Sequence, residues 1–204
     1  MTSDETTATG RRERKKAATR TAISDAALRL FLERGYDQVG VKEVADAADV
    51  AVTTLFQHFP SKEALVFDED GDREQALVAA VTERLATQSV IDAVQGYYDR
   101  SQSLTLDPGL RNFLHLVQST PALREYSRRM WTRHENALAR AIVATQPASS
   151  AATGIAAAAL ARFILEGLHL AGEQPHPREA LTETFGLLRT GWGEFGRTDR
   201  QPSA

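Results

Sequence analysis

The segment VKEVADAADVAVTTLFQHFP, residues 41–60, decides the fold that this sequence predicts. Its apolar positions follow a helical period in two short stretches, which predicts one helix over residues 41–48 and another over residues 51–59. Pro60 ends the second helix, because the residue before a proline is disfavoured in the helical region. Val50 places an apolar side chain in the short turn between them. Two helices of about two turns joined in this way are typical of a helix-turn-helix.

A longer helix precedes this pair and supplies the apolar face that two short helices lack. Its apolar residues fall on one stripe at positions i, i+3, i+4, i+7 and i+8, and Gly35 ends the helix as a left-handed cap. The residues of the stripe are Ile23, Ala26, Ala27, Leu30 and Phe31. Leu55 and Phe59 close the core from the third helix. We therefore expect a three-helix domain over residues 13–60.

The three helices together resemble a known DNA-binding domain. Residues 20–66, RTAISDAALRLFLERGYDQVGVKEVADAADVAVTTLFQHFPSKEALV, are similar to the DNA-binding domain of the tetracycline-repressor (TetR) family over nearly fifty residues. The resemblance implies an all-helical homodimer that binds a palindromic operator in double-stranded DNA as a transcriptional repressor and is released by a small ligand. An activator, or a regulator that acts without a ligand, has the same sequence pattern.

The resemblance also implies which side chains meet DNA. Val52 and Thr53 should face the major groove, where hydroxyl and methyl groups read base edges, and Gln57 can bond an adenine or a phosphate. Lys62 matches a lysine that meets a phosphate at the start of the next helix. The positions implied in DNA contacts are Lys42, Val52, Thr53, Thr54, Phe56, Gln57, His58 and Lys62.

Three residues depart from the pattern of the family. Phe56 replaces the usual tyrosine, so that one phenolic contact to a phosphate is lost. Asp49 replaces the usual glycine of the turn, and we expect the turn to survive because aspartate tolerates the left-handed conformation better than most residues. Gly40 stands where a threonine or serine usually caps the second helix, at a cost of roughly a few tenths of a kcal/mol.

Composition and charge restrict the classes of function. The chain has 204 residues and no cysteine, which excludes disulfides, thiolate zinc sites and a thiol nucleophile. We find no run of about 20 apolar residues and no hydrophobic N-terminal segment. We therefore expect no membrane partner and a cytoplasmic protein, associated with the nucleoid when bound to DNA.

The net charge of −3 is unevenly distributed along the chain. Residues 1–20 carry six basic and three acidic side chains, so the rest of the chain is acidic. A basic arm ahead of an acidic body suits a protein that presents only one end to a polyanion. A solvated tail has the same composition, and charge alone leaves both interpretations open.

Helical periodicity continues to the end of the chain, so the predicted fold class is all-α with about nine helices. We expect a disordered arm over residues 1–12, a ligand-binding and dimerisation domain over residues 61–196 and a tail over residues 197–204. Ser61 should cap a helix that extends to about residue 86. Further helices are expected over residues 89–104, from residue 108, and over residues 121–144, 151–171 and 178–196.

The last helix carries an apolar seam with the spacing of a coiled coil. We expect this helix and the one before it to form a four-helix bundle with the same helices of a second subunit. The alternative is that the seam belongs to the internal core of one subunit. The residues of the seam are Leu181, Phe185, Leu188, Trp192 and Phe195.

Polar and aromatic side chains on apolar helix faces predict a mostly apolar pocket for a small-molecule effector. Phe113, Trp131 and Phe163 lie on separate helices, and we expect them to converge on one cavity. Residues 121–142 also resemble a subgroup with an acyl-CoA-like ligand domain, which makes an acyl-CoA-like effector one candidate. The candidate pocket residues are Tyr97, Phe113, His115, Tyr126, Trp131, His134, Phe163 and His169.

A helical enzyme or metal protein is the alternative class. Glu166 and His169 form a Glu-x-x-His pair, the unit from which di-iron bundle sites are built. Such a site needs a second pair, and the segment from Glu173 to His176 contains Pro175, which prevents helical geometry. The sequence therefore favours a protein that is not an enzyme and has no cofactor and no bound metal.

Overall fold

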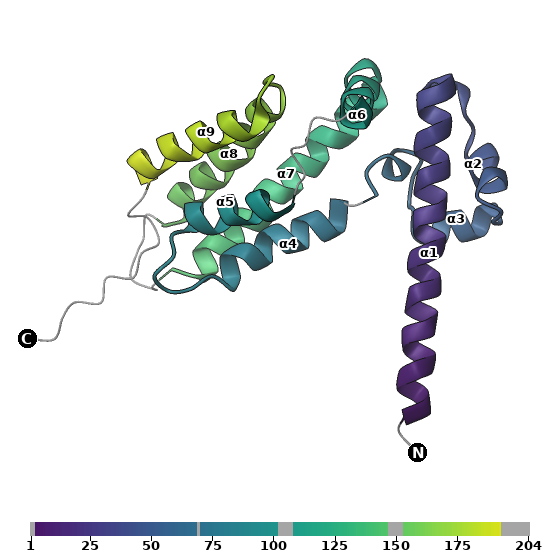
Figure 1. Cartoon of the computed structure of the whole chain (residues 1–204), viewed down its shortest axis with the longest axis horizontal. Coiled ribbons are helices and arrows are strands. Elements are labelled where there is room, and N and C mark those ends of the chain that lie inside the picture. The colour runs from purple at the N-terminus through teal and green to yellow at the C-terminus, as the bar shows by residue number, and fades with distance from the viewer. Residues whose placement is uncertain (1–2, 69, 102–107, 147–152, 193–204) are drawn as a thin grey trace, which may run out of the picture. The chain divides into compact units, whose positions relative to one another are not determined.

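The computed structural model describes residues 3–68, 70–101, 108–146 and 153–192, and within these ranges it contains helices but no β-strand (Figure 1). The all-α class and the nine helices expected from the sequence are confirmed for this described part of the chain. The helices are α1 (Ser3–Arg34), α2 (Val41–Ala47), α3 (Val52–His58), α4 (Asp70–Thr82), α5 (Val90–Ser101), α6 (Pro108–Ser119), α7 (Pro121–Ala144), α8 (Thr153–Gly172) and α9 (Pro177–Trp192), with short 3-10 helices η1 (Tyr36–Gln38) and η2 (Glu63–Leu65).

The chain folds into two compact units. The first, here called the head unit, comprises residues 1–69 and 111–126. The second, here called the body unit, comprises residues 70–110 and 127–204. The head unit therefore holds the three helices of the expected DNA-binding domain together with residues from α6 and α7.

Helices α1, α2 and α3 share one apolar core in the head unit. Ile23, Ala27 and Phe31 of α1 are fully buried, as the apolar stripe in the sequence predicts. Leu55 of α3 and Phe59, which follows that helix, are fully buried against them. Because both of these side chains lie on the inward side, the opposite side of α3 is left to solvent.

Two residues with positive φ shape the turns around α2. Gly35 has φ 88° and ψ 147°, a conformation that residues with a Cβ rarely adopt. Asp49 has φ 54°, so this aspartate does take the left-handed conformation that the sequence predicts for the turn before α3. At Gly40, which has no side chain to cap α2, the Glu43 carboxylate accepts a hydrogen bond from the Gly40 N–H at 2.8 Å.

Two segments differ from the sequence-based expectation. α1 is helical from Ser3 onward, where the sequence predicts disorder over residues 1–12, because the run of Ala, Arg, Lys and Glu that follows favours helix. The helix expected from Ser61 to about residue 86 is divided into η2 and α4. The first ends at Leu65, and α4 begins at Asp70.

Residues 111–126 pack against the core of the head unit. The ring of Phe67 stacks on that of Tyr126 with centroids 5.2 Å apart, and it meets the ring of Phe113 edge-on at 5.9 Å. Three aliphatic side chains from the same stretch complete this packing: Leu116, Val117 and Leu123. The head unit is thus larger than the three helices of the DNA-binding domain.

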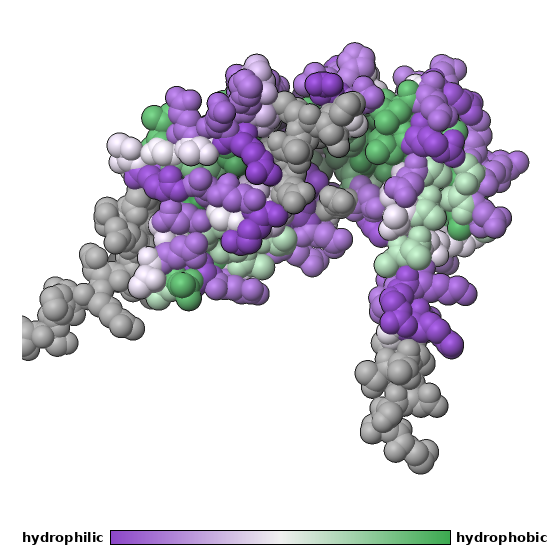
Figure 2. Space-filling model, in the orientation of Figure 1, coloured by the Kyte–Doolittle hydropathy of each residue, from purple (hydrophilic) through white to green (hydrophobic). Residues whose placement is uncertain are grey.

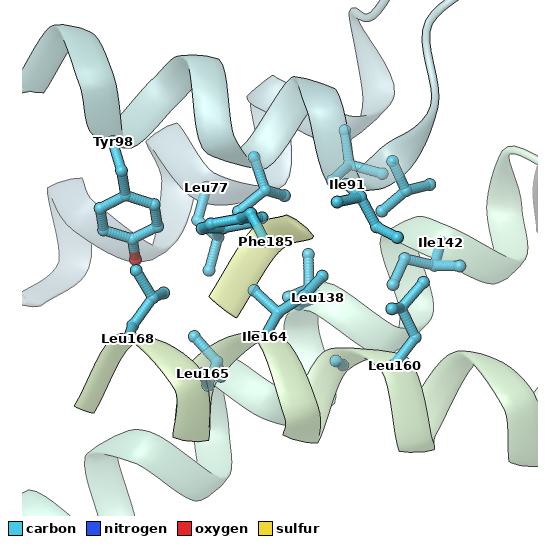
Figure 3. Close-up of a cluster of buried hydrophobic side chains, with 14 of the residues drawn as sticks. Leu77, Ile91, Tyr98, Leu138, Ile142, Leu160, Ile164, Leu165, Leu168 and Phe185 are labelled. Atoms are coloured by element: carbon cyan, nitrogen blue, oxygen red, sulfur yellow. The ribbon is translucent and has the colours of Figure 1, made fainter. Parts of the chain in front are cut away.

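The body unit has a core of its own, formed by α4, α5, α7, α8 and α9 (Figure 3). Leu181 and Phe185 of α9 are 2% and 1% exposed, and Phe185 lies among side chains from neighbouring helices. These two residues therefore belong to the internal core, so their assignment to a seam between subunits is wrong. Leu188 packs against the same core, whereas the side chain of Trp192 and all of Phe195 lie outside the described residues.

Helix α8 is more apolar than the sequence analysis allows for. Over Gly154–Gly172 its mean hydropathy is 1.4, and it is the one helix of the described chain long and apolar enough to cross a membrane by length and composition. Its alanines raise the hydropathy without forming a run of large apolar residues. Leu160, Ile164 and Leu168 are buried in the core of the body unit, as expected for the central helix of a globular domain.

The conformation of Gly35 leads to a test of the corner between α1 and α2. Gly35→Ala should lower the free energy of unfolding by about 1–3 kcal/mol, because alanine is strained at this φ and ψ. Gly10→Ala is the control, since a Cβ at Gly10 meets nothing within 4 Å and alanine favours helix. Urea titrations monitored by circular dichroism measure both. Equal stability of the two variants would contradict the strain at Gly35.

Candidate nucleic-acid interface

Helix α3 presents a mixed polar and aromatic side to solvent. Thr53 and Gln57 are exposed, and Phe56 is 49% exposed, so this ring is not part of the core. Val52, Thr54 and His58 are half-buried beside them, and Leu55 points inward. Lys42 is exposed on α2. A short helix anchored by one side and free on the other has the form that enters a major groove.

Lys62 is bound within the head unit. Its Nζ donates a hydrogen bond to the Tyr36 carbonyl at 2.6 Å and lies 4.0 Å from the centroid of the Tyr36 ring. Burial lowers the pKa of Lys62, while acidic neighbours, with Asp37 first among them, oppose the shift. The ammonium therefore stabilises the corner after α1. A phosphate that contacts Lys62 would have to bind an ammonium that already donates to the Tyr36 carbonyl.

His58, the last residue of α3, lies in a positively charged environment. Burial lowers the pKa of His58, and the charges of Arg20 and Lys16 on α1 lower it further. The imidazole is therefore neutral near pH 7 and offers one N–H donor rather than a charge. Basic residues continue along α1 from Lys16 to Arg11, where all side chains are exposed and Figure 2 shows a strongly hydrophilic surface.

Arg20 is a residue of this region that the sequence analysis does not single out. Its guanidinium donates to the His58 carbonyl at 2.9 Å and to the Asp68 carbonyl at 2.7 Å. These partners lie 38 and 48 positions further along the chain. Local periodicity and motif spacing carry no signal for contacts at such separations, so only the folded structure reveals them.

The candidate pocket residues are divided between the two units. Phe113, His115 and Tyr126 belong to the head unit, whereas Trp131 belongs to the body unit and Phe163 on α8 is 51% exposed. Phe113 and Trp131 thus belong to different units, and the convergence of Phe113, Trp131 and Phe163 on one cavity stays a prediction. Three candidates lie at the core of the body unit: Tyr97, Trp131 and His134.

His134 has a structural role in the body unit. It is 2% exposed, and its Nε2 lies 2.6 Å from Oδ1 of Asp70, the first residue of α4. Arg133 pairs with the same aspartate and with Glu74, 3.3 Å away. The ring of Trp131 meets the His134 ring edge-on at 5.7 Å. Together these contacts bind the beginning of α4 to α7.

The Glu-x-x-His pair on α8 is not built into a site. Glu166 and His169 are both exposed, and His169 pairs instead with Glu173 at 3.6 Å. Among the residues that the structure describes, no group of three metal-binding side chains forms around this pair. The alternative class of helical metal enzyme gains no support from this geometry.

Comparison with known proteins agrees with the geometry of the head unit. The sequence profile described as "Bacterial regulatory proteins, tetR family" matches residues 23–68, which include α2, α3 and Lys62. The HTH-type transcriptional regulator TcmR of Streptomyces glaucescens is 34% identical over 146 residues, which cover 67% of this chain and 64% of TcmR. The chain belongs to the tetR family.

Two further relatives match shorter stretches of the chain. The transcriptional repressor KstR of Mycobacterium tuberculosis is 43% identical over 75 residues, which cover 37% of this chain and 31% of KstR. A putative mycofactocin biosynthesis regulator, MftR, of the same species is 26% identical over 133 residues, which cover 62% of this chain and 65% of MftR. The chain thus spans slightly less than two thirds of TcmR and of MftR.

Solved structures show the same fold at lower sequence identity. A SmeT–triclosan complex superimposes with a TM-score of 0.57 and 20% identity over 91% of this chain and 100% of that one. NalD, the secondary repressor of the MexAB-OprM multidrug efflux pump in Pseudomonas aeruginosa, gives a TM-score of 0.53 and 21% identity over 87% of this chain and 97% of NalD. The tetR-family fold therefore extends beyond the head unit.

The position of Lys62 in this tetR-family head leads to a stability prediction. Lys62→Ala should lower the free energy of unfolding by about 1–2 kcal/mol, because the Tyr36 carbonyl loses a charged donor and the ring loses its cation. Lys42→Ala removes an exposed lysine and should change it by less than about 0.5 kcal/mol. Denaturant unfolding of both variants measures the difference. An unchanged stability of the Lys62 variant would contradict the structural role.

Proposed function

We propose that this chain is a transcriptional repressor that binds a palindromic DNA operator as a homodimer and responds to a small ligand. The observation that carries the proposal is the outward side of α3, which presents Thr53 and Gln57 on a helix fixed from behind by Leu55 and Phe59. The names of KstR and NalD as repressors favour repression over activation. Such a regulator works in the cytoplasm, at the nucleoid.

The exposed and half-buried residues of α3 divide into two roles. Val52, Thr53 and Gln57 offer methyl, hydroxyl and amide groups, which are suited to base edges in the major groove. Thr54 and His58 lie toward the edges of the helix, where hydroxyl and imidazole N–H groups suit the phosphate backbone. Phe56 adds apolar surface and no charge. This division predicts that sequence preference resides mainly in three side chains.

Positive charge for the phosphate backbone comes from α1 and α2. Lys42 is exposed on α2, and five basic residues are exposed on the N-terminal part of α1. The arm is helical rather than disordered, so it holds these charges along one helix, and the charge of Lys16 acts on His58 of α3. Their contribution is electrostatic, so it adds affinity for any DNA sequence and weakens with salt.

Selection of duplexes from a random DNA pool tests the proposed function. The unaltered chain should select a palindrome whose half-sites are roughly one helical turn apart, about 34–36 Å. Thr53→Ala should change the preferred bases, because it removes one hydroxyl from the reading side. Thr182→Ala, which removes an exposed hydroxyl from α9, is the control. Selection of no sequence by the unaltered chain would reject the proposal.

Salt dependence separates the two roles. Lys42→Ala should leave the selected sequence unchanged and reduce the slope of log K against log salt by about one unit. Thr53→Ala should leave that slope unchanged. Fluorescence anisotropy with labelled duplexes at several salt concentrations provides both slopes. A reduced slope for the threonine variant, or an unreduced slope for the lysine variant, would contradict the assignment.

The proposed homodimer uses the outer faces of α8 and α9. Leu181 and Phe185 are internal, so the apolar residues available to a second copy are those that remain exposed. These are Ile155 at 86%, Phe163 at 51% and Leu170 at 50% on α8, and Leu187 at 70% on α9. Burial of such side chains favours association through the hydrophobic effect. The two helices retain the role expected for them, with different residues.

A charge on this face tests the dimer. Leu187→Asp should shift the chain from dimer to monomer in sedimentation velocity, because an aspartate is costly to bury in an apolar interface. Leu85→Asp is the matched control, since Leu85 is 72% exposed in the connection after α4. A dimer that survives Leu187→Asp as well as Leu85→Asp would place the interface elsewhere.

We further propose an apolar or amphipathic effector bound in the body unit. Its support comes from the half-buried rings of Tyr97 and Trp131 at the core and from the binding of triclosan by SmeT. An acyl-CoA-like effector has less support, because the basic residues that could hold its phosphates already have partners. Arg124 donates to the Gln118 carbonyl, and Arg133 pairs with Asp70.

Triclosan is a suitable first probe of the effector, followed by long-chain acyl-CoA compounds. In a Trp192→Phe background, Trp131 is the remaining tryptophan, and a bound ligand should change its fluorescence. Binding should also raise the melting temperature, since the unfolded chain has no site. The same compound should weaken DNA binding by about 5–150-fold. A compound that binds without weakening DNA affinity would contradict ligand release.

A further inference from the structure

Arg20 joins three segments of the head unit. From α1, its Nη1 donates to the carbonyl of His58, the last residue of α3, at 2.9 Å. Its Nη2 donates to the Asp68 carbonyl at 2.7 Å, and its Nε lies 2.5 Å from the Asp68 carboxylate. The guanidinium also lies over the ring of Phe59 with 4.5 Å to the centroid.

Each of these contacts has a physical effect on α3. The carbonyl of His58 is one of the last four of its helix, which have no partner within the helix, so Arg20 caps it. A cation at the C-terminus also complements the negative end of the helix dipole. The ring of Phe59, which is fully buried, fixes the guanidinium in the plane where both carbonyls can be reached.

The fork of donors is specific to arginine. A lysine has one compact ammonium and cannot hold two carbonyls and a carboxylate in a fixed plane. The Asp68 carboxylate pairs with Nε of the same guanidinium. The side chain of Asp68 is 23% exposed and that of Arg20 is 40% exposed. The pair is therefore partly shielded from water, and its guanidinium also donates to two backbone carbonyls.

We propose that Arg20 is a positioning residue for the DNA-reading helix and that Asp68 is required for this role. The inference rests on the proposed function. The guanidinium does not serve as a phosphate contact. It fixes the end of α3 relative to α1, so that Val52, Thr53 and Gln57 enter the groove at one angle.

The contact between Arg20 and Asp68 lies where the chain leaves the head unit. Asp68 is followed two residues later by Asp70, which begins α4 in the body unit and is bound there by His134. Arg20 therefore holds the chain at Asp68, two residues before α4 begins.

Asp68→Asn gives a test in which the electrostatic effect and the positioning effect predict opposite changes in DNA affinity. Loss of a negative charge near DNA should by itself tighten binding. Loss of the contact between Asp68 and Arg20 should instead weaken binding to the selected duplex. Asp46→Asn, at an exposed aspartate on α2, removes the same charge without touching Arg20 and is the matched control. Arg20→Lys keeps the positive charge and removes the fork.

We expect Asp68→Asn and Arg20→Lys each to weaken binding to the selected duplex by about tenfold, and neither to weaken binding to a mixed-sequence duplex. Amide hydrogen exchange at residues 56–59 should become faster in both variants and stay unchanged in Asp46→Asn. Circular dichroism confirms that each variant is folded at the temperature used.

Three outcomes would overturn the inference. Tighter or equal binding of Asp68→Asn to the selected duplex would show that the contact between Asp68 and Arg20 does not contribute to DNA affinity. Faster exchange without loss of affinity would leave Arg20 with a role in stability alone. Unchanged exchange at residues 56–59 would show that Arg20 and Asp68 do not hold the end of α3. This result can be obtained without DNA. Failure of the unaltered chain to select a DNA sequence would instead reject the proposed function.

Discussion

The burial of Leu55 and Phe59 against the apolar stripe of α1 is the constraint on which the candidate site depends. Both side chains are fully buried, and they fix which side of α3 faces the core. The remaining side is then available to solvent and carries Thr53 and Gln57. A helix of seven residues is not stable in isolation. The reading face therefore exists only because α1 and α2 hold it.

Charge in the head unit is used in two different ways. Lys62 and Arg20 direct their cationic groups to backbone carbonyls and aromatic rings, where they stabilise the α1–α2 corner and the end of α3. Lys42 and the basic residues of the α1 arm remain in solvent, available to a polyanion. Sequence composition treats all these cations alike. Their partners in the fold determine which stabilise the protein and which are free to bind DNA.

Most of the fold follows from local patterns in the sequence. Helical periodicity, proline positions and the turn before α3 predict the all-α class and the limits of α2, α3 and α7 to within a few residues. Even the left-handed conformation of Asp49 follows from the chemistry of its side chain. These features depend on residues close together in the chain, which is why the sequence reveals them.

The features that sequence reasoning missed depend on distant partners. Leu181 and Phe185 have the spacing of an intersubunit seam, but an internal core requires the same spacing. Phe113 and Tyr126 pack with Phe67 in the head unit, a contact that no local pattern encodes. Arg20 likewise depends on partners 38 and 48 positions away. Tertiary packing decides each of these cases.

The central claim is that the outward side of α3 lies in the major groove of a specific DNA sequence. Because the chain has no cysteine, Ala51→Cys, at the exposed residue that precedes α3, provides one thiol to which an iron–EDTA cleavage reagent can be attached. On a duplex that the chain selects, we expect DNA cleavage confined to each half-site, and none from the reagent attached through Leu85→Cys. Equal or absent cleavage from both positions would contradict it.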